Sequence, residues 1–310
     1  MKGKIEEISG SKEITVNGKT EVLDTRSSYG DGYDKALSYF KDQFEKEGYK
    51  VAIDSYTRYG ETYHNLRAVK LAATKPGEVV MYGAHIDSTA GSPWGFEPKA
   101  PGADDDGSGA AALTEIAHAI KNLPMDRTVV FSLFSGEEEG LWGSRAMAEL
   151  YRQSQADVRK DLSNAGVDLK HETDGLGKIV AMYQMDMVGY NDTGSNTIES
   201  HDTTSNAAAH ALTDLLAANQ QKYGLDLKVY GAHNEGLTNR SDHYPFYKNG
   251  IPAVLVIEPY DSTDNFNPNY HSTRDTVEKI NVPYLENVTK LVAASGVELA
   301  GLPNLEVQQH

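Results

Sequence analysis

Short apolar segments that alternate with amphipathic segments constrain the fold of this chain more than any other feature. We predict strands at 79–86, 128–134, 178–185 and 251–257. Helical patterns lie between and after them, at 113–123, at 205–223 and from Pro283 onward. Several of the strands are apolar throughout, and such strands need helices on both faces. The alternation therefore predicts an α/β fold, a mixed and mostly parallel β-sheet sandwiched between α-helices.

The N-terminal part of the chain has a different pattern. Asn17-Gly18 lies between two short runs of β-forming residues, which predicts a hairpin and a small β element over 1–24. Apolar residues at steps of four, three and four then predict a helix at 33–48. Two strand-like runs follow, at 50–58 and 61–72. Because no repeat, low-complexity block or linker divides the sequence, we expect one domain, 1–310.

Composition limits the classes of function. The 310 residues include 29 Lys+Arg and 45 Asp+Glu, and the net charge of −16 argues against nucleic acid or an anionic membrane as partner. Cys is absent, so any metal must be held by His and carboxylate side chains. The sequence contains neither an apolar run long enough for a membrane span nor a signal peptide, so we expect a soluble chain that is not anchored in a membrane. We also expect a monomer.

Acidic and histidine residues follow the ends of the predicted strands. His85 and Asp87 close the first strand, and their spacing of two lets Asp87 accept the free ring N–H of His85. Adjacent Glu137 and Glu138 follow the second strand, and Asp186 follows the third. In sheets covered on both faces, ligands bind at the carboxyl ends of the strands. We therefore expect these side chains to share one rim of the sheet.

Two further segments complete the set. Three consecutive aspartates, 104–106, open a helix, although one would suffice as its cap, and like charges this close together favour a bound cation. His271 lies beyond the last strand. Two His and three carboxylate ligands suit two divalent ions that share a bridging carboxylate. The residues thus predict a dinuclear metal site, in which one of the adjacent glutamates binds metal while the other moves protons.

The ordered set of motifs resembles the co-catalytic dizinc aminopeptidases typified by bacterial leucyl aminopeptidase. The matching segments lie between about 25 and 300 and read Gly-Ala-His-Ile-Asp-Ser, Pro-Gly-Ala-Asp-Asp-Asp-Gly-Ser-Gly, Ser-Gly-Glu-Glu-Glu-Gly-Leu-Trp-Gly-Ser, Gln-Met-Asp-Met, Arg-Ser-Asp-His-Tyr-Pro-Phe and Asn-Pro-Asn-Tyr-His-Ser-Thr-Arg-Asp-Thr. The resemblance implies a zinc-exopeptidase fold. It also implies hydrolysis of the N-terminal peptide bond of peptides with a free N-terminus.

Carried over position by position, the resemblance implies two Zn²⁺ ions, with Co²⁺ or Mn²⁺ as possible substitutes. The five implied ligands are His85 and Asp186 on one ion, Glu138 and His271 on the other, and Asp105 bridging both. The implied catalytic residues are Glu137 as general base, Asp87 orienting His85, and Tyr270 stabilising the oxyanion. A cis peptide bond at Asp105–Asp106 is also expected.

The resemblance extends to the substrate. Met187 and Phe266 align with residues that line the first side-chain pocket, which implies a preference for large apolar N-terminal residues, and Arg240 is a further substrate-binding candidate. His243 is expected to be structural. Relatives are commonly secreted, so we expect an extracellular protein, or otherwise a cytoplasmic one. The alternatives are a glutaminyl cyclase-like enzyme, a carboxypeptidase-like enzyme and a non-catalytic binding domain.

Overall fold

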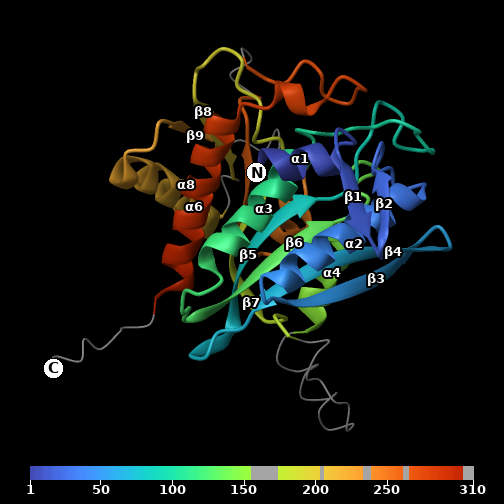
Figure 1. Cartoon of the computed structure of the whole chain (residues 1–310). Coiled ribbons are helices and arrows are strands. Elements are labelled where there is room, and N and C mark those ends of the chain that lie inside the picture. Colours follow the sequence, from blue (N-terminus) through green and yellow to red (C-terminus); the bar gives the residue numbers. More distant parts are fainter. Residues whose placement is uncertain (155–173, 203–205, 233–238, 261–264, 303–310) are drawn as a thin grey trace, which may run out of the picture.

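An eight-stranded sheet forms the centre of the computed structural model, which describes residues 1–154, 174–202, 206–232, 239–260 and 265–302 (Figure 1). Its strand order is β3-β4-β6-β5-β7-β10-β8-β9. The strands are β3 (Lys50–Arg58), β4 (Glu61–Lys70), β5 (Lys75–His85), β6 (Arg127–Phe134), β7 (Lys178–Met185), β8 (Thr197–His201), β9 (Lys228–Ala232) and β10 (Ala253–Ile257). Neighbours β6–β5, β5–β7, β7–β10 and β8–β9 are parallel. The mixed, mostly parallel sheet is therefore confirmed.

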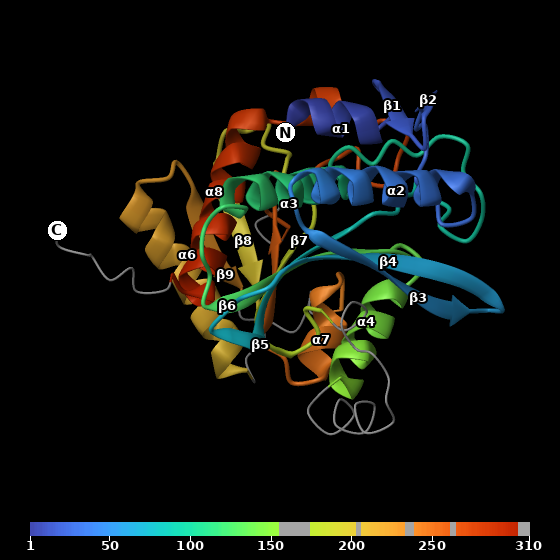
Figure 2. The same cartoon turned by 60° about the horizontal axis from the view of Figure 1, so that its bottom comes forward.

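Helices cover both faces of this sheet (Figure 2). One face carries α2 (Asp31–Lys46), α3 (Gly107–Ile120), α6 (Ala207–Tyr223) and α8 (Val282–Ala300). The other face carries α4 (Trp142–Gln153) and α7 (His243–Lys248). Along β6, Phe131 and Leu133 pack under the first group, whereas Val130 and Phe134 pack under the second. This burial on both sides explains why apolar residues of the strand face both sides of the sheet.

The N-terminal segment is only partly the β element predicted over 1–24. Strands β1 (Glu13–Val16) and β2 (Lys19–Val22) form the expected hairpin, and the φ angles of Asn17 and Gly18 are 52° and 75°, as a type I′ turn requires. Lys2–Ile8, however, forms helix α1, with Ile5 and Ile8 fully buried. Two apolar residues in seven give too short a pattern for a helix to be distinguished from the sequence.

Most predicted elements are present, with boundaries shifted by a few residues. The structure also contains elements that were not predicted from the sequence, namely strands β8 and β9 and helices α4 and α7. A short 3-10 helix, η1 (Val277–Lys279), precedes α8. The first residue of the helix predicted at 205–223 lies outside the described residues. In the described part of the chain, no helix combines the length and the apolar character that crossing a membrane requires.

The order of the strands brings the predicted functional residues to one place. β6, β5, β7 and β10 are consecutive and parallel, so their carboxyl ends lie at the same edge. His85 is the last residue of β5, Asp186 follows β7 directly, and Glu137 and Glu138 lie in the turn after β6. The sheet thus supplies the rim that the sequence predicted.

Candidate metal centre and active site

The five predicted metal ligands come together at this rim. Nε2 of His85 lies 3.0 Å from Oδ1 of Asp105 and 3.5 Å from Oδ1 of Asp186. Nε2 of His271 lies 3.2 Å from Oδ2 of Asp105 and 2.8 Å from Oε2 of Glu138. The two oxygens of Asp105 therefore face different histidines, which is the placement that a carboxylate bridging two ions needs.

The donor set fits divalent metal ions. Nitrogen and oxygen ligands at about 2.0–2.2 Å from a tetrahedral zinc are separated from one another by roughly 3.4 Å, close to the distances above. Among the described residues, Oδ2 of Asp105 and Oε1 of Glu138 are buried without a hydrogen-bond partner. Buried carboxylate oxygens without a partner are costly, and a cation would satisfy both.

The electrostatics of the cluster support the same conclusion. Burial raises the pKa of Glu138 to about 7, and the neighbouring charge of Asp105 adds to this effect. Burial also holds the pKa of Glu137 well above its usual range, and Asp242 is among the acids that raise it further. Burial alone would lower the pKa of His271, but Asp105 and Glu138 raise it to about 10. The site therefore has an excess of negative charge that divalent cations are suited to offset.

Two of the three consecutive aspartates have different roles: Asp106 caps helix α3, whereas Asp105 is the predicted metal ligand. Oδ1 of Asp106 accepts a hydrogen bond from the backbone N–H of Gly109 at 3.0 Å, capping α3, and Oδ2 accepts one from the N–H of His85 at 2.9 Å. Asp106 also lies near His85 and Asp186. Because both of its oxygens already accept backbone hydrogen bonds, we assign the ligand role to Asp105. The Asp105–Asp106 peptide bond is cis, as expected.

Behind Asp105, a second set of buried polar groups holds the backbone. Asp275 accepts the N–H groups of Asp104 and Asp105 at 3.1 and 3.0 Å. The side-chain amide of Asn267 donates to both Asp104 and Asp275, at 3.0 and 3.2 Å. Both residues stand in a motif that the sequence analysis noted, but their function as backbone supports was not predicted, because it depends on a contact 170 residues away in sequence.

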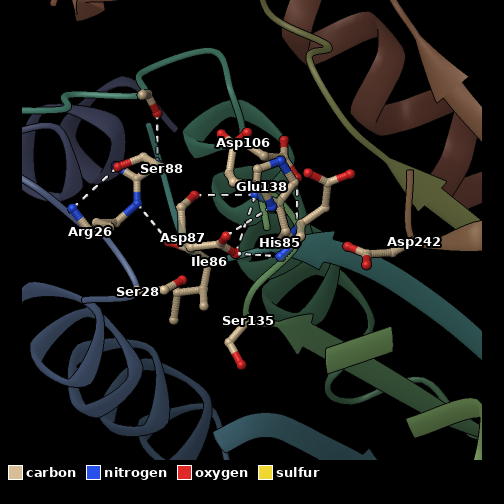
Figure 3. A network of polar contacts seen from close by, with 12 residues as sticks. Arg26, Ser28, His85, Ile86, Asp87, Ser88, Asp106, Ser135, Glu138 and Asp242 are labelled. Carbon is tan, nitrogen blue, oxygen red and sulfur yellow. Dashed lines mark hydrogen bonds and ion pairs between the residues drawn. The ribbon is translucent and has the colours of Figure 1, made fainter. Parts of the chain in front are cut away.

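Asp87 fixes the turn that carries Glu137 and Glu138. Figure 3 shows Asp87 beside Glu138. Its Oδ1 accepts the N–H of Glu137 at 3.3 Å, and its Oδ2 accepts the N–H of Glu138 at 3.1 Å. Nδ1 of His85 lies 3.7 Å from the Asp87 carboxylate and 3.2 Å from the Asp87 backbone carbonyl. Asp87 therefore contacts His85, as predicted, but its carboxylate hydrogen-bonds the two glutamates rather than the imidazole.

Ser241 orients Asp186, one of the predicted ligands. Its hydroxyl donates to Oδ2 of Asp186 at 2.7 Å, which leaves Oδ1 to face His85. The neighbouring His243 begins α7 and is buried, and burial lowers its pKa to about 3. Among the described residues, His243 belongs to neither of the groups that could hold a metal. The structural role expected for His243 stays a prediction.

Replacing Ser241 by Ala is predicted to lower zinc affinity about tenfold, because residues that orient ligands typically contribute 10–100-fold. The measurement is competition for zinc with a chromophoric chelator. Ser9→Ala is the matched control, since Ser9 is also buried and donates one hydrogen bond, to Ile5 O, away from the site. Equal zinc affinity in S241A and wild type would contradict this role.

A pocket opens beside the metal ligands and contains the three predicted substrate-binding residues. Met187, Phe266 and Arg240 all line it. Met187 packs with Leu255 and Ile257 in a small apolar cluster, and all three line the pocket. The φ angle of Met187 is 55° and that of His271 is 50°. Non-glycine residues rarely adopt this left-handed conformation, and they do so most often at functional sites.

Tyr270 lies at the mouth of this pocket. Its ring stacks on the imidazole of His271, with ring centroids 3.6 Å apart. Partial burial raises the pKa of its hydroxyl, and the charges of Asp105 and Glu138 raise it further. The hydroxyl therefore keeps its proton at neutral pH and can donate a hydrogen bond to a ligand in the pocket.

Arg26 supports the site and was not predicted from sequence. It is 1% exposed, and its guanidinium donates to backbone carbonyls at 2.7–2.8 Å; these belong to Ile8, Ile86, Pro101 and Gly102. Its backbone N–H donates to the hydroxyl of Ser88, so Arg26 contacts both Ile86, within the His85–Asp87 segment, and Ser88, directly after it (Figure 3). Arg26 thereby joins α1, the end of β5 and the loop that leads to the aspartate triplet.

Comparisons with known proteins agree with this geometry. The chain is 30% identical over 248 residues to a probable leucine aminopeptidase of Arthroderma otae, covering 76% of this chain and 59% of that protein. It thus spans about three fifths of the length of that curated relative. Among solved structures, a zinc aminopeptidase from Bacillus subtilis superposes with a TM-score of 0.60 at 24% identity, covering 78% of this chain and 51% of that one.

The glutaminyl cyclase of Fimbriiglobus ruber superposes with a TM-score of 0.72 at 19% identity, covering 97% of this chain and 94% of the cyclase. At these identities the two structures show a shared fold. The profile of peptidase family M28 matches residues 68–296, a span that includes all five predicted ligands and Glu137. Since this match covers well over half of the chain, the protein belongs to peptidase family M28.

Proposed function

We propose that the protein is a zinc-dependent aminopeptidase that binds two metal ions and hydrolyses the N-terminal peptide bond of its substrates. The observation that carries this proposal is the position of Asp105, whose two oxygens face His85 and His271 separately. The similarity to a probable leucine aminopeptidase supports the same activity. The test is release of p-nitroaniline from leucine p-nitroanilide, with loss of this activity on treatment with a chelator.

The side chains around the pocket suit this reaction. Bound zinc would polarise the substrate carbonyl and lower the pKa of water. Glu137 lines the pocket beside the ligands and can accept a proton from the attacking water, then pass it to the leaving amine. The protonated hydroxyl of Tyr270 is available to stabilise the developing oxyanion. The excess of carboxylates favours a substrate with a cationic N-terminus.

The apolar residues that line the pocket predict a preference for large apolar N-terminal residues. Met187, Leu255 and Ile257 are buried there, so a leucine side chain gains apolar contact that a charged side chain cannot. We expect kcat/KM for leucine p-nitroanilide to exceed that for the glutamate and lysine analogues by about tenfold or more. A preference for glutamate would instead show that Arg240, at the same pocket, sets the specificity.

The alternatives make different predictions. A glutaminyl cyclase would convert N-terminal glutamine to pyroglutamate without cleaving the peptide. This alternative is supported by the similarity of the fold alone. A carboxypeptidase would need a basic cluster for the substrate carboxylate, but among the described residues that line the pocket the one Lys or Arg is Arg240. A non-catalytic binding domain would bind peptides without turnover. Mass spectrometry of a peptide incubated with the zinc-loaded protein separates these outcomes.

A further inference from the structure

Two of the three most exposed aromatic side chains of the described residues, Tyr59 and Trp94, lie against one buried tryptophan. Tyr59, Trp94 and Phe96 are 74%, 63% and 59% exposed, whereas Trp142 is 4% exposed. The ring centroids of Tyr59 and Trp94 lie 5.5 and 6.1 Å from that of Trp142. Phe96 lies two residues after Trp94 in the same loop, and its ring packs over Gly30. We refer to Tyr59, Trp94, Phe96 and Trp142 as the aromatic patch.

The loop that carries Trp94 is held in an ordered conformation by Glu97. The carboxylate of Glu97 accepts hydrogen bonds from the Thr89 hydroxyl at 2.6 Å and from the N–H groups of Ala90 and Ser92 at 2.8 and 3.1 Å. The loop therefore presents Trp94 outward. Grouped, exposed aromatic side chains on a rigid support are typical of binding surfaces.

The aromatic patch borders the catalytic rim on two sides. Trp142 packs against Gly136, next to Glu137, where an added Cβ would lie 3.0 Å from the Trp142 Cβ. The loop of Trp94 passes the ligand His271, since a Cβ at Gly91 would lie 3.4 Å from the His271 carbonyl oxygen. A chain that leaves the active site over either of these residues reaches the patch.

The occupant best suited to this position is the substrate peptide beyond the scissile bond. The apolar pocket takes the first side chain, so the remaining residues must leave past the rim. An extended segment of three residues is about 10 Å long, enough to contact Tyr59 and Trp94 across Trp142. The guanidinium of Arg58 lies 4.7 Å from the Tyr59 ring centroid and offers positive charge at this end, complementary to a peptide carboxylate.

We propose that the aromatic patch binds the apolar residues that follow the scissile bond and so favours peptides over single-residue amides. The inference rests on the proposed aminopeptidase activity. It assigns a second specificity determinant, separate from the pocket for the first side chain.

The test compares a double variant, Tyr59→Ala with Trp94→Ala, on leucinamide and on the pentapeptide Leu-Ala-Phe-Phe-Ala, with initial rates measured as free leucine. We expect kcat/KM for the pentapeptide to fall about tenfold, mainly through KM, while leucinamide hydrolysis changes less than twofold. The matched control is Tyr223→Ala with Tyr230→Ala, because these aromatic residues are 53% and 51% exposed and belong to α6 and β9. It should leave both substrates unaffected.

Equal losses on both substrates, or no loss on the pentapeptide, would overturn the proposal while leaving the aminopeptidase activity intact. If the aromatic patch instead joins two copies of the chain, the wild-type protein will sediment as a dimer and the double variant as a monomer. This result would also overturn the proposal. If the wild-type protein releases leucine from neither substrate, the proposed function itself is wrong and the inference falls with it.

Discussion

Glu137→Gln is expected to reduce kcat by about 10²–10⁴-fold while leaving the zinc content of the protein unchanged. Glutamine has nearly the same shape as glutamate but cannot accept a proton, so the variant removes general base catalysis alone. The backbone N–H of Glu137 still donates to Asp87, which keeps the turn in place. The measurements are steady-state kinetics on leucine p-nitroanilide and metal analysis of the purified variant.

Glu138→Gln is the matched comparison, because the two residues are adjacent and both donate their backbone N–H groups to the carboxylate of Asp87. Glu138 faces His271 at 2.8 Å, so its replacement is expected to lower both zinc content and activity. Two results would contradict the roles given to the two glutamates. One is substantial turnover in E137Q, and the other is a loss of zinc in E137Q as large as that in E138Q.

Arg26→Met is expected to lower the free energy of unfolding by about 3–5 kcal/mol. The substitution keeps much of the apolar volume but leaves four carbonyl oxygens without their donor in a buried position, and each such loss is costly. The measurement is urea unfolding followed by circular dichroism. We also expect weaker zinc binding, since Arg26 holds the carbonyl of Ile86, directly after the ligand His85.

Arg152→Met is the control for this change. The side chain of Arg152 is 59% exposed and pairs with Glu149 on the surface of α4, so its loss is expected to change stability by less than about 1 kcal/mol. A loss of stability in R26M no larger than that in R152M would contradict the role given to Arg26.

The sheet and the ligand set could be predicted from the sequence because they depend on local patterns. Strands β5, β6 and β7 are short apolar runs, and each is followed within a few residues by the acid or histidine that it presents. Strand β8 was missed because three of its four buried residues, Glu199, Ser200 and His201, are polar. Glu199 and His201 pair with each other at 2.8 Å and are fully buried, so the strand lacks the apolar signature of its neighbours.

The supports of the site could not be predicted, because they depend on contacts between distant parts of the chain. The carbonyls that Arg26 binds are 18 to 76 residues away, and any residue type presents the same carbonyl. The sequence around Arg26 therefore carries no sign of its partners. The position of the Asp87 carboxylate is a similar case, since its acceptance of two N–H groups from the Glu137 turn depends on how β5 and β6 align.

The central claim is that this chain binds two zinc ions through Asp105, and zinc titration of chelator-treated protein tests it most directly. The measurement follows bound zinc and leucine p-nitroanilide hydrolysis together in wild type and in Asp105→Asn. We predict that the wild-type chain binds two zinc ions and that their addition restores its activity. Zinc content and activity should both be sharply reduced in D105N. Full activity at one zinc ion per chain, or activity that survives complete removal of metal, would contradict it.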